Sequence, residues 1–119
     1  MKVLIAEDND LMRKSLAFYL KDEGFQVLEV TNGKEALQAV ESHQIELVIT
    51  DLNMPESGGL ELIHTIRDVL KKDMPIIVLT ASGVEKSELE AFELGASEFI
   101  SKPFSPHVLK ARIKKLLNV

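Results

Sequence analysis

The sequence predicts an open α/β fold in which a five-stranded parallel sheet is covered by helices on both faces. Five short segments rich in β-branched or aromatic residues are typical of strands buried on both sides: 3–6, 27–30, 47–50, 76–79 and 99–100. Longer segments with helical spacing of apolar residues alternate with them. Strands joined through helices of this length pair in parallel by right-handed crossovers, which place helices on both faces.

The helical segments differ in how clearly their apolar residues repeat. The segments within 12–20, 63–70 and 109–117 carry apolar residues three or four positions apart, as one buried helix face requires. The two remaining segments are shorter and weaker, one within 36–40 and the other carried by Leu89 and Phe92. Strand and helix thus alternate five times along the chain. The sequence itself contains no internal repeats, low-complexity stretches or linkers.

Residues with strong conformational preferences mark the ends of these helices. Gly24 and Gly95 stand where the first and fourth helices are expected to stop. Asn32 is a good N-cap for the second helix, and Ser105 followed by Pro106 is a typical helix start.

Length and composition bound the possible functions. The chain has 119 residues, 45% of them apolar, which suits a single domain over residues 1–119. It has no cysteine, so disulfides, thiolate metal sites and cysteine nucleophiles are excluded. No apolar run approaches the roughly 20 residues of a membrane span, and the first residues lack the pattern of a signal peptide. We therefore expect a cytoplasmic protein that does not enter a membrane.

The charge of the chain argues against nucleic-acid binding. The net charge is −5, and basic residues cluster only near the end of the last helix, at Lys110, Arg112, Lys114 and Lys115. Such a cluster is usually the solvated face of a terminal helix. We expect no direct nucleic-acid binding by this domain.

The predicted fold indicates where a functional site would form. In open α/β sheets, ligands bind beyond the carboxyl ends of the strands, near the point where the strand order reverses. The residues at those ends are Glu7 and Asp8 after the first strand, Asp51 after the third, Thr80 after the fourth and Lys102 after the fifth. Each alone would be a weak signal, but together they suit one site.

The residue types at these strand ends favour a metal-assisted phosphoryl site. Three carboxylates converging at one edge repel each other unless a cation is present. Mg²⁺ prefers oxygen ligands and is usually held by one or two carboxylates with a phosphate completing its shell, and Asp8 and Asp51 can supply the carboxylates. Lys102 can neutralise phosphoryl oxygens from the opposite side, and Thr80 offers a hydroxyl donor.

Five stretches of the sequence resemble the receiver domain of bacterial response regulators, over residues 2–117. They are LIAEDN at 4–9, VITDLNMP at 48–55, GGLELI at 58–63, IIVLTAS at 76–82 and GASEFISKPF at 95–104. The resemblance implies a flavodoxin-like (βα)5 fold with strand order 2-1-3-4-5.

The resemblance also assigns roles at the metal and phosphoryl site. Asp51 would be the phosphoacceptor and would bind Mg²⁺, or Mn²⁺, together with Asp8. The backbone carbonyl of Asn53 would be a further metal ligand, and Glu7 would contact the metal through water. Lys102 would contact the phosphoryl group.

The same family implies switch, dephosphorylation and backbone roles at five positions. Thr80 and Phe99 match its switch pair, in which the hydroxyl moves to the phosphoryl group and the aromatic ring turns inward. Asn53 and Ser82, two residues beyond Asp51 and Thr80, would tune how readily water removes the phosphoryl group. The peptide bond before Pro103 is expected to be cis.

The family resemblance predicts partners as well. A sensor histidine kinase or phosphotransfer protein would supply the phosphoryl group, and an output domain or downstream protein would contact the face formed by the fourth helix, fifth strand and fifth helix. The last stretch looks most like regulators with a winged-helix DNA-binding domain, which form phosphorylation-dependent homodimers through this face. Glu98 and Arg112 match one of their charge pairs, whereas Ser97 and Val108 stand where acids are usual.

Such a domain is a signalling switch, catalysing only its own phosphoryl transfer and slow autodephosphorylation, and two other classes compete with it. A phosphohydrolase with an aspartyl nucleophile normally has an acid two residues later to protonate the leaving group, and that position is Asn53. A flavin or nucleotide carrier needs a glycine-rich or hydroxyl-rich first loop to hold phosphate, whereas the first loop here is the acidic segment 7–10.

Overall fold

A five-stranded parallel sheet forms the centre of the protein, as the sequence predicts. The computed structural model describes residues 1–54, 56, 58–81 and 85–119. The strands are β1 (Lys2–Ala6), β2 (Gln26–Val30), β3 (Leu47–Thr50), β4 (Ile76–Thr80) and β5 (Glu98–Ser101). All neighbouring pairs are parallel, and the order is β2-β1-β3-β4-β5. The predicted fold class and strand order are therefore confirmed.

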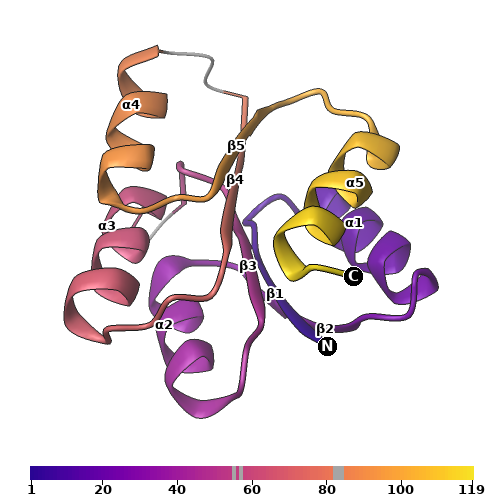
Figure 1. The fold of residues 1–119 in the computed structure, drawn as a ribbon, viewed down its shortest axis with the longest axis horizontal. Coiled ribbons are helices and arrows are strands. Elements are labelled where there is room, and N and C mark those ends of the chain that lie inside the picture. Colours follow the sequence, from indigo (N-terminus) through magenta and orange to yellow (C-terminus); the bar gives the residue numbers. More distant parts are fainter. Residues whose placement is uncertain (55, 57, 82–84) are drawn as a thin grey trace.

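Helices cover both faces of this sheet (Figure 1). They are α1 (Asp10–Asp22), α2 (Gly33–Ser42), α3 (Gly59–His64) with its π-helical continuation η1 (Thr65–Val69), α4 (Glu85–Leu94) and α5 (Pro106–Leu117). In Figure 1, α1 and α5 lie on one side of the sheet, and α2, α3 and α4 lie on the other. Within the described part of the chain, no helix has the length and apolar character needed to cross a bilayer.

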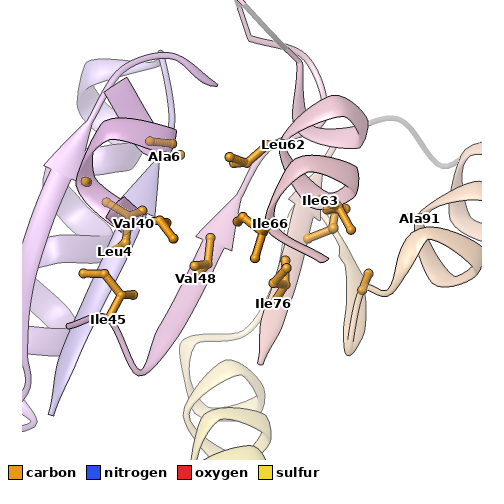
Figure 2. Packing of buried hydrophobic residues seen from close by; sticks show 14 of the residues in the cluster. Leu4, Ala6, Val40, Ile45, Val48, Leu62, Ile63, Ile66, Ile76 and Ala91 are labelled. Carbon is orange, nitrogen blue, oxygen red and sulfur yellow. The ribbon is translucent and has the colours of Figure 1, made fainter. Parts of the chain in front are cut away.

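The sheet separates two hydrophobic cores, because successive side chains of a strand point to opposite faces. Leu4, Val48 and Ile76 pack toward α2, α3 and α4, where they meet residues such as Val40 and Leu62 (Figure 2). The other face of the same strands packs against α1 and α5, with the buried residues Val3, Ile5, Leu47, Ile49, Ile77, Leu16, Leu20, Leu109 and Ile113. A sheet held from both sides gives the strand ends fixed positions.

The predicted helix ends are found in the structure. The side chain of Asn32 accepts a hydrogen bond from the backbone N–H of Glu35 at 2.8 Å and caps α2. Ser105 caps α5, with Pro106 as its first residue. Gly24 and Gly95 follow α1 and α4 with φ angles of 97° and 115°, a backbone conformation that favours glycine.

Two local features differ from the sequence-based expectation. The helix expected to run through 63–70 widens into a π-helix from Thr65, with the N–H of Leu70 bonded to the carbonyl of Thr65 at 2.9 Å. On α4 the two large apolar residues face outward: Leu89 is 55% exposed and Phe92 43%, while Ala91 is fully buried. The helix was predicted correctly, but its buried face was not, because a small side chain makes the close contact with the sheet.

Candidate functional site

The carboxyl ends of four strands bring polar side chains to one edge of the sheet. Glu7 follows β1, Asp51 follows β3, Thr80 ends β4 and Lys102 follows β5. Since β1, β3, β4 and β5 are neighbours in this order and all parallel, these residues lie along the same edge. The structure thus brings Glu7, Asp51 and Lys102 into contact and places Thr80 on the same edge of the sheet.

Lys102 links two of the acids directly. Its Nζ donates to Oε1 of Glu7 at 2.6 Å and to Oδ2 of Asp51 at 2.7 Å. Both carboxylates are buried, with Glu7 only 4% and Asp51 only 8% exposed. The two ion pairs therefore form where water screens charge poorly, and two carboxylates share one ammonium group.

The environment shifts the proton affinity of both Glu7 and Lys102. Burial of the Glu7 carboxyl is the largest influence and raises its pKa above the ordinary value, with a further rise from the charge of Asp51. Hydrogen bonds from Lys102 and from the N–H of Asn9 oppose this rise without cancelling it. Burial by itself would lower the pKa of Lys102, but its bonds to Asp51 and Glu7 raise it. The site is thus a compact cluster of one cation and two anions.

The loop after β3 fixes the second oxygen of Asp51. Oδ1 accepts the backbone N–H of Asn53 at 3.0 Å, and the N–H of Asp51 continues the sheet by bonding to the carbonyl of Ala6 at 3.1 Å. Gly59, the first residue of α3, closes this loop with a bond from its N–H to the carbonyl of Leu52 at 3.0 Å. The carboxylate of Asp51 is therefore held from both sides.

The predicted metal ligands are only partly assembled. Asp8 and Asn53 are exposed, in contrast to Glu7 and Asp51. Among the residues whose placement is described, no three Asp, Glu or His side chains are gathered closely enough to hold a metal ion. Instead, the ammonium group of Lys102 lies between the two buried carboxylates. The metal-binding roles of Asp8, Asn53 and Glu7 remain predictions.

The two predicted switch residues lie on neighbouring strands and on the same face of the sheet. Phe99 pairs with Val78, and Thr80 is two residues further along β4, so all three side chains point toward the α2, α3 and α4 side. Thr80 is fully buried, whereas Phe99 is half-buried. The carbonyl of Thr80 also accepts the N–H of Lys102 at 2.8 Å.

Two further predicted positions have different outcomes. The peptide bond between Lys102 and Pro103 is cis, as expected. Ser82, expected with Asn53 to tune dephosphorylation, lies outside the described residues.

A residue that the sequence reading overlooked, Arg13, lies beside the acidic loop. Arg13 is only 7% exposed, and its guanidinium donates to the backbone carbonyl of Glu7 at 3.0 Å. The buried residues of α1 are Arg13, Leu16, Ala17 and Leu20, so this arginine occupies the helix face that packs on the sheet. A basic residue in phase with that apolar stripe was the signal that could have identified it.

An open hollow lies beside Lys102 at this edge of the sheet. It is lined by Asn9, Leu11, Met12, Ser15, Ala81 and Lys102. Its walls are mainly apolar side chains of α1, and Leu11 is 78% exposed. The side chain of Lys102, which is 15% exposed, therefore borders this hollow.

The helices α4 and α5 carry exposed apolar side chains. They are Leu89 and Phe92 of α4 and Val108 of α5. Glu98 and Arg112, the predicted charge pair of a dimer, form an ion pair with each other within the chain at 2.5 Å. This pair joins β5 to α5.

Known proteins resemble this chain over nearly its whole length. The transcriptional regulatory protein SrrA of Staphylococcus aureus (strain NCTC 8325 / PS 47) is 39% identical over 117 residues, which are 98% of this chain and 48% of SrrA. The chain thus spans about half the length of the curated relatives it matches.

Solved structures share the fold. A putative response regulator from Chloroflexus aurantiacus J-10-fl has a TM-score of 0.92 at 33% identity, with 99% of this chain and 98% of that chain covered. The receiver domain of sensor histidine kinase PA1611 from Pseudomonas aeruginosa PAO1, described with a magnesium ion coordinated in its active site cleft, has a TM-score of 0.89 at 22% identity, covering 99% and 98%. The latter likeness concerns the fold alone.

The family assignment rests on the match of most of the chain. Residues 3–114 match the response regulator receiver domain. This match includes β1 from its second residue, all of β2 to β5, and the strand-end residues from Glu7 to Lys102. The chain therefore belongs to the response regulator receiver domain family of two-component signalling.

Proposed function

We propose that the protein is a phosphorylation-activated switch in which Asp51 accepts a phosphoryl group from a phosphohistidine of a sensor histidine kinase or phosphotransfer protein. The observation that carries this proposal is the position of Lys102, whose ammonium group contacts both Asp51 and Glu7 at the strand ends. A cation fixed beside a buried carboxylate suits the transfer of a negatively charged group to that carboxylate.

The proposed transfer needs alignment and charge stabilisation more than covalent help. A carboxylate oxygen of Asp51 attacks phosphorus, the bond from phosphorus to the donor breaks, and the product is an acyl phosphate. The N–H of Asn53 holds the other side of the carboxylate. Lys102 can shift its hydrogen bond from Asp51 to a phosphoryl oxygen while it stays bonded to Glu7. Water later hydrolyses the acyl phosphate, at a rate that Asn53 and Ser82 would tune.

The donors at this edge fit Mg²⁺ or Mn²⁺. Carboxylate and carbonyl oxygens are the ligands that these hard cations prefer, and Asp8, Asp51 and the carbonyl of Asn53 offer them. We propose Glu7 as a contact through water, since its carboxyl group is buried and already bonded to Lys102. When bound, the cation would neutralise charge on the phosphoryl oxygens. The PA1611 receiver domain, which shares this fold, is described with a magnesium ion coordinated in its active site cleft.

The proposed output runs through Thr80 and Phe99. A phosphoryl oxygen on Asp51 would attract the hydroxyl of Thr80, and the space it leaves would admit the ring of Phe99. This is consistent with their shared face and with the half-buried position of Phe99. The movement would change the surface of α4, β5 and α5, where Leu89, Phe92 and Val108 are exposed.

The partners follow from this surface and from the relatives. We propose that an output domain or a downstream protein binds the α4, β5 and α5 face, and that two phosphorylated copies can pair through it. The relative SrrA is a transcriptional regulatory protein, and this chain spans about half of such relatives. We place the protein in the cytoplasm, where a sensor kinase presents its phosphohistidine.

Phosphorylation should require both Asp51 and a divalent cation. We expect the wild-type protein, incubated with Mg²⁺ and a small acyl phosphate, to gain the mass of one phosphoryl group in intact-protein mass spectrometry. Addition of a chelator should abolish the gain. Asp51→Asn should not gain it under any condition, because an amide cannot form the acyl phosphate.

Two results would contradict the proposed function. A wild-type protein that stays unmodified with Mg²⁺, or an Asp51→Asn protein that gains the same mass, would show that Asp51 is not the acceptor. Lys110→Met serves as a control, since Lys110 pairs with Glu23 far from the strand-end cluster and should not affect the reaction.

Replacing Thr80 by alanine should separate phosphorylation from output. Moving a two-state equilibrium from mostly one state to mostly the other takes about 5.5 kcal/mol of differential binding. One hydrogen bond to a charged group contributes about 1.5–3 kcal/mol. Lys102 and the loop after β4 must therefore contribute the rest of the free energy. We expect Asp51 to be phosphorylated normally, with smaller NMR shift changes over residues 85–112. The full wild-type pattern in phosphorylated Thr80→Ala would refute coupling through Thr80 and Phe99.

A further inference from the structure

Arg13 has three different acceptors although it is nearly inaccessible to solvent. Its guanidinium donates to the carbonyl of Glu7 at 3.0 Å, to Oδ1 of Asp10 at 2.7 Å and to Oε1 of Glu29 at 3.3 Å. Glu7 lies at the end of β1, Asp10 begins α1 and Glu29 belongs to β2. One side chain therefore ties together three elements around the loop that carries the acids.

Of the three contacts of Arg13, the bond to Glu7 is the one that affects the proposed metal site, because Glu7 precedes Asp8. The N–H of Glu7 bonds to the carbonyl of Val30 at 3.1 Å, and its carbonyl bonds to Arg13. Its backbone is thus held on both sides, which sets the plane of the peptide joining Glu7 to Asp8. Asp8 itself is exposed, so the direction of its side chain depends on this backbone.

The charge of Arg13 is already balanced by residues outside the strand-end cluster. Asp10 and Glu29 both form ion pairs with it, at 2.7 and 3.3 Å. Lys102, by contrast, supplies the cation between Glu7 and Asp51. The planar guanidinium of Arg13 can therefore serve to hold a backbone group in place, because its N–H donors have a fixed geometry, whereas an ammonium group on a flexible stem is less well suited to this.

We propose that Arg13 is a positioning residue that fixes the Glu7–Asp8 peptide so that Asp8 can bind the divalent cation. This rests on the proposed function, in which Asp8 and Asp51 hold Mg²⁺. Arg13 would act from behind the ligands, through the backbone, and would not touch the cation or the phosphoryl group. Residues that orient metal ligands in this way commonly change metal affinity about 10- to 100-fold when they are replaced.

The direction in which Mg²⁺ affinity changes when Arg13 is replaced distinguishes a positioning role from two simpler roles. If Arg13 acted only as a positive charge near the site, its removal would strengthen Mg²⁺ binding, because two like charges would no longer repel. If it only stabilised the fold, its removal would lower the melting temperature and leave Mg²⁺ affinity unchanged. A positioning role requires Mg²⁺ binding to become weaker, by about tenfold or more.

The test is a Mg²⁺ titration of unphosphorylated protein, followed through the amide NMR shifts of residues 7–13. Arg13→Met removes the guanidinium and keeps an unbranched apolar stem, and we expect the weakening stated above. Glu29→Gln is the matched control, because it alters one partner of Arg13 and leaves the bond to Glu7 in place. It should bind Mg²⁺ as the wild type does. Asp8→Asn should lose most of the binding.

An affinity of Arg13→Met equal to or tighter than that of the wild type would overturn the assignment. If this variant does not fold, Arg13→Lys decides: it keeps the charge without the planar guanidinium, so wild-type affinity in it would also overturn the assignment. Wild-type protein that binds no Mg²⁺ would refute the proposed metal site and this inference together. Wild-type binding that Asp8→Asn abolishes and Arg13→Met leaves unchanged would refute this inference alone.

Discussion

Gly59→Ala is expected to lower the free energy of unfolding by about 3 kcal/mol, at the upper end of what overpacking costs. A Cβ atom at Gly59 would lie 2.4 Å from the carbonyl oxygen of Asp51 and 2.8 Å from Cα of Leu52. Both neighbours are backbone atoms, so no side-chain rotation can relieve the contact. The loop that carries Asp51 would have to move away from α3. Urea unfolding of the wild type and the variant measures the loss.

Gly58→Ala is the matched control for this substitution. A Cβ atom there would meet only the carbonyl oxygen of Leu52, at 3.0 Å, and Gly58 has a φ angle of −74° that alanine adopts readily. The unfolded chain also loses freedom when glycine is replaced, which favours folding by about 0.4–1 kcal/mol. We expect a small net change. Equal unfolding free energies for the Gly58→Ala and Gly59→Ala proteins would contradict the close approach of α3 to the Asp51 loop.

Lys102→Met is also expected to destabilise the protein strongly. We expect it to lower the free energy of unfolding of the metal-free protein by about 3 kcal/mol at neutral pH. The substitution leaves Glu7 and Asp51 buried, close together and without their shared cation. The comparable substitution Lys110→Met removes an ion pair with Glu23 in which both side chains are partly exposed, and should change stability little.

Acid and Mg²⁺ should each reduce the stability deficit of Lys102→Met, which is the difference in unfolding free energy between the wild type and this variant. Burial raises the pKa of Glu7, and loss of the Lys102 hydrogen bond would raise it further. A raised pKa in the folded state means that the related stability is present below the ordinary pKa of 4.5 and is lost as pH rises through the folded-state value. The deficit should therefore be largest near neutral pH and shrink in acid.

Mg²⁺ would restore positive charge beside the two carboxylates, so it should raise the melting temperature of Lys102→Met more than that of the wild type. Thermal melts across pH, with Mg²⁺ or with a chelator, measure both trends. A deficit that stays constant with pH and Mg²⁺ would mean that Lys102 stabilises the fold in some other way than by balancing Glu7 and Asp51.

Much of the fold followed from patterns that are local in sequence. Apolar strands and helical stripes fixed the order of elements, and Asn32, Ser105, Gly24 and Gly95 marked their ends as predicted. The outward turn of Leu89 and Phe92 was not foreseen, because two large apolar residues on a short helix do not reveal which face packs on the sheet. That choice depends on how closely α4 approaches β5, a tertiary property.

The sequence predicted which residues form the site better than it predicted which of them are in contact. Topology alone brings Glu7, Asp51 and Lys102 to the same edge, since every strand runs in the same direction. From the sequence, Lys102 is expected to contact a phosphoryl group, whereas in the structure it pairs with both carboxylates. A long flexible side chain can reach several partners, so its choice depends on distances that no sequence pattern contains.

The contacts of Arg13 show a different limit of prediction from sequence. Its place in the buried stripe of α1 was visible in the sequence, but two of its three hydrogen bonds reach groups outside α1, the side chain of Glu29 and the backbone carbonyl of Glu7. A carbonyl group is present at every residue and leaves no trace in composition or spacing. Contacts between a side chain and a distant backbone group therefore become visible only in the structure.

The most direct measurement of the central claim is the location of the phosphoryl group itself. Wild-type protein phosphorylated with a small acyl phosphate and Mg²⁺ can be reduced with borohydride, which converts an aspartyl phosphate to homoserine, and then mapped by peptide mass spectrometry. We expect a single modified position, Asp51, and no modification when Mg²⁺ is chelated. Modification at Asp8, Glu7 or any other residue, with Asp51 intact, would contradict the proposed switch.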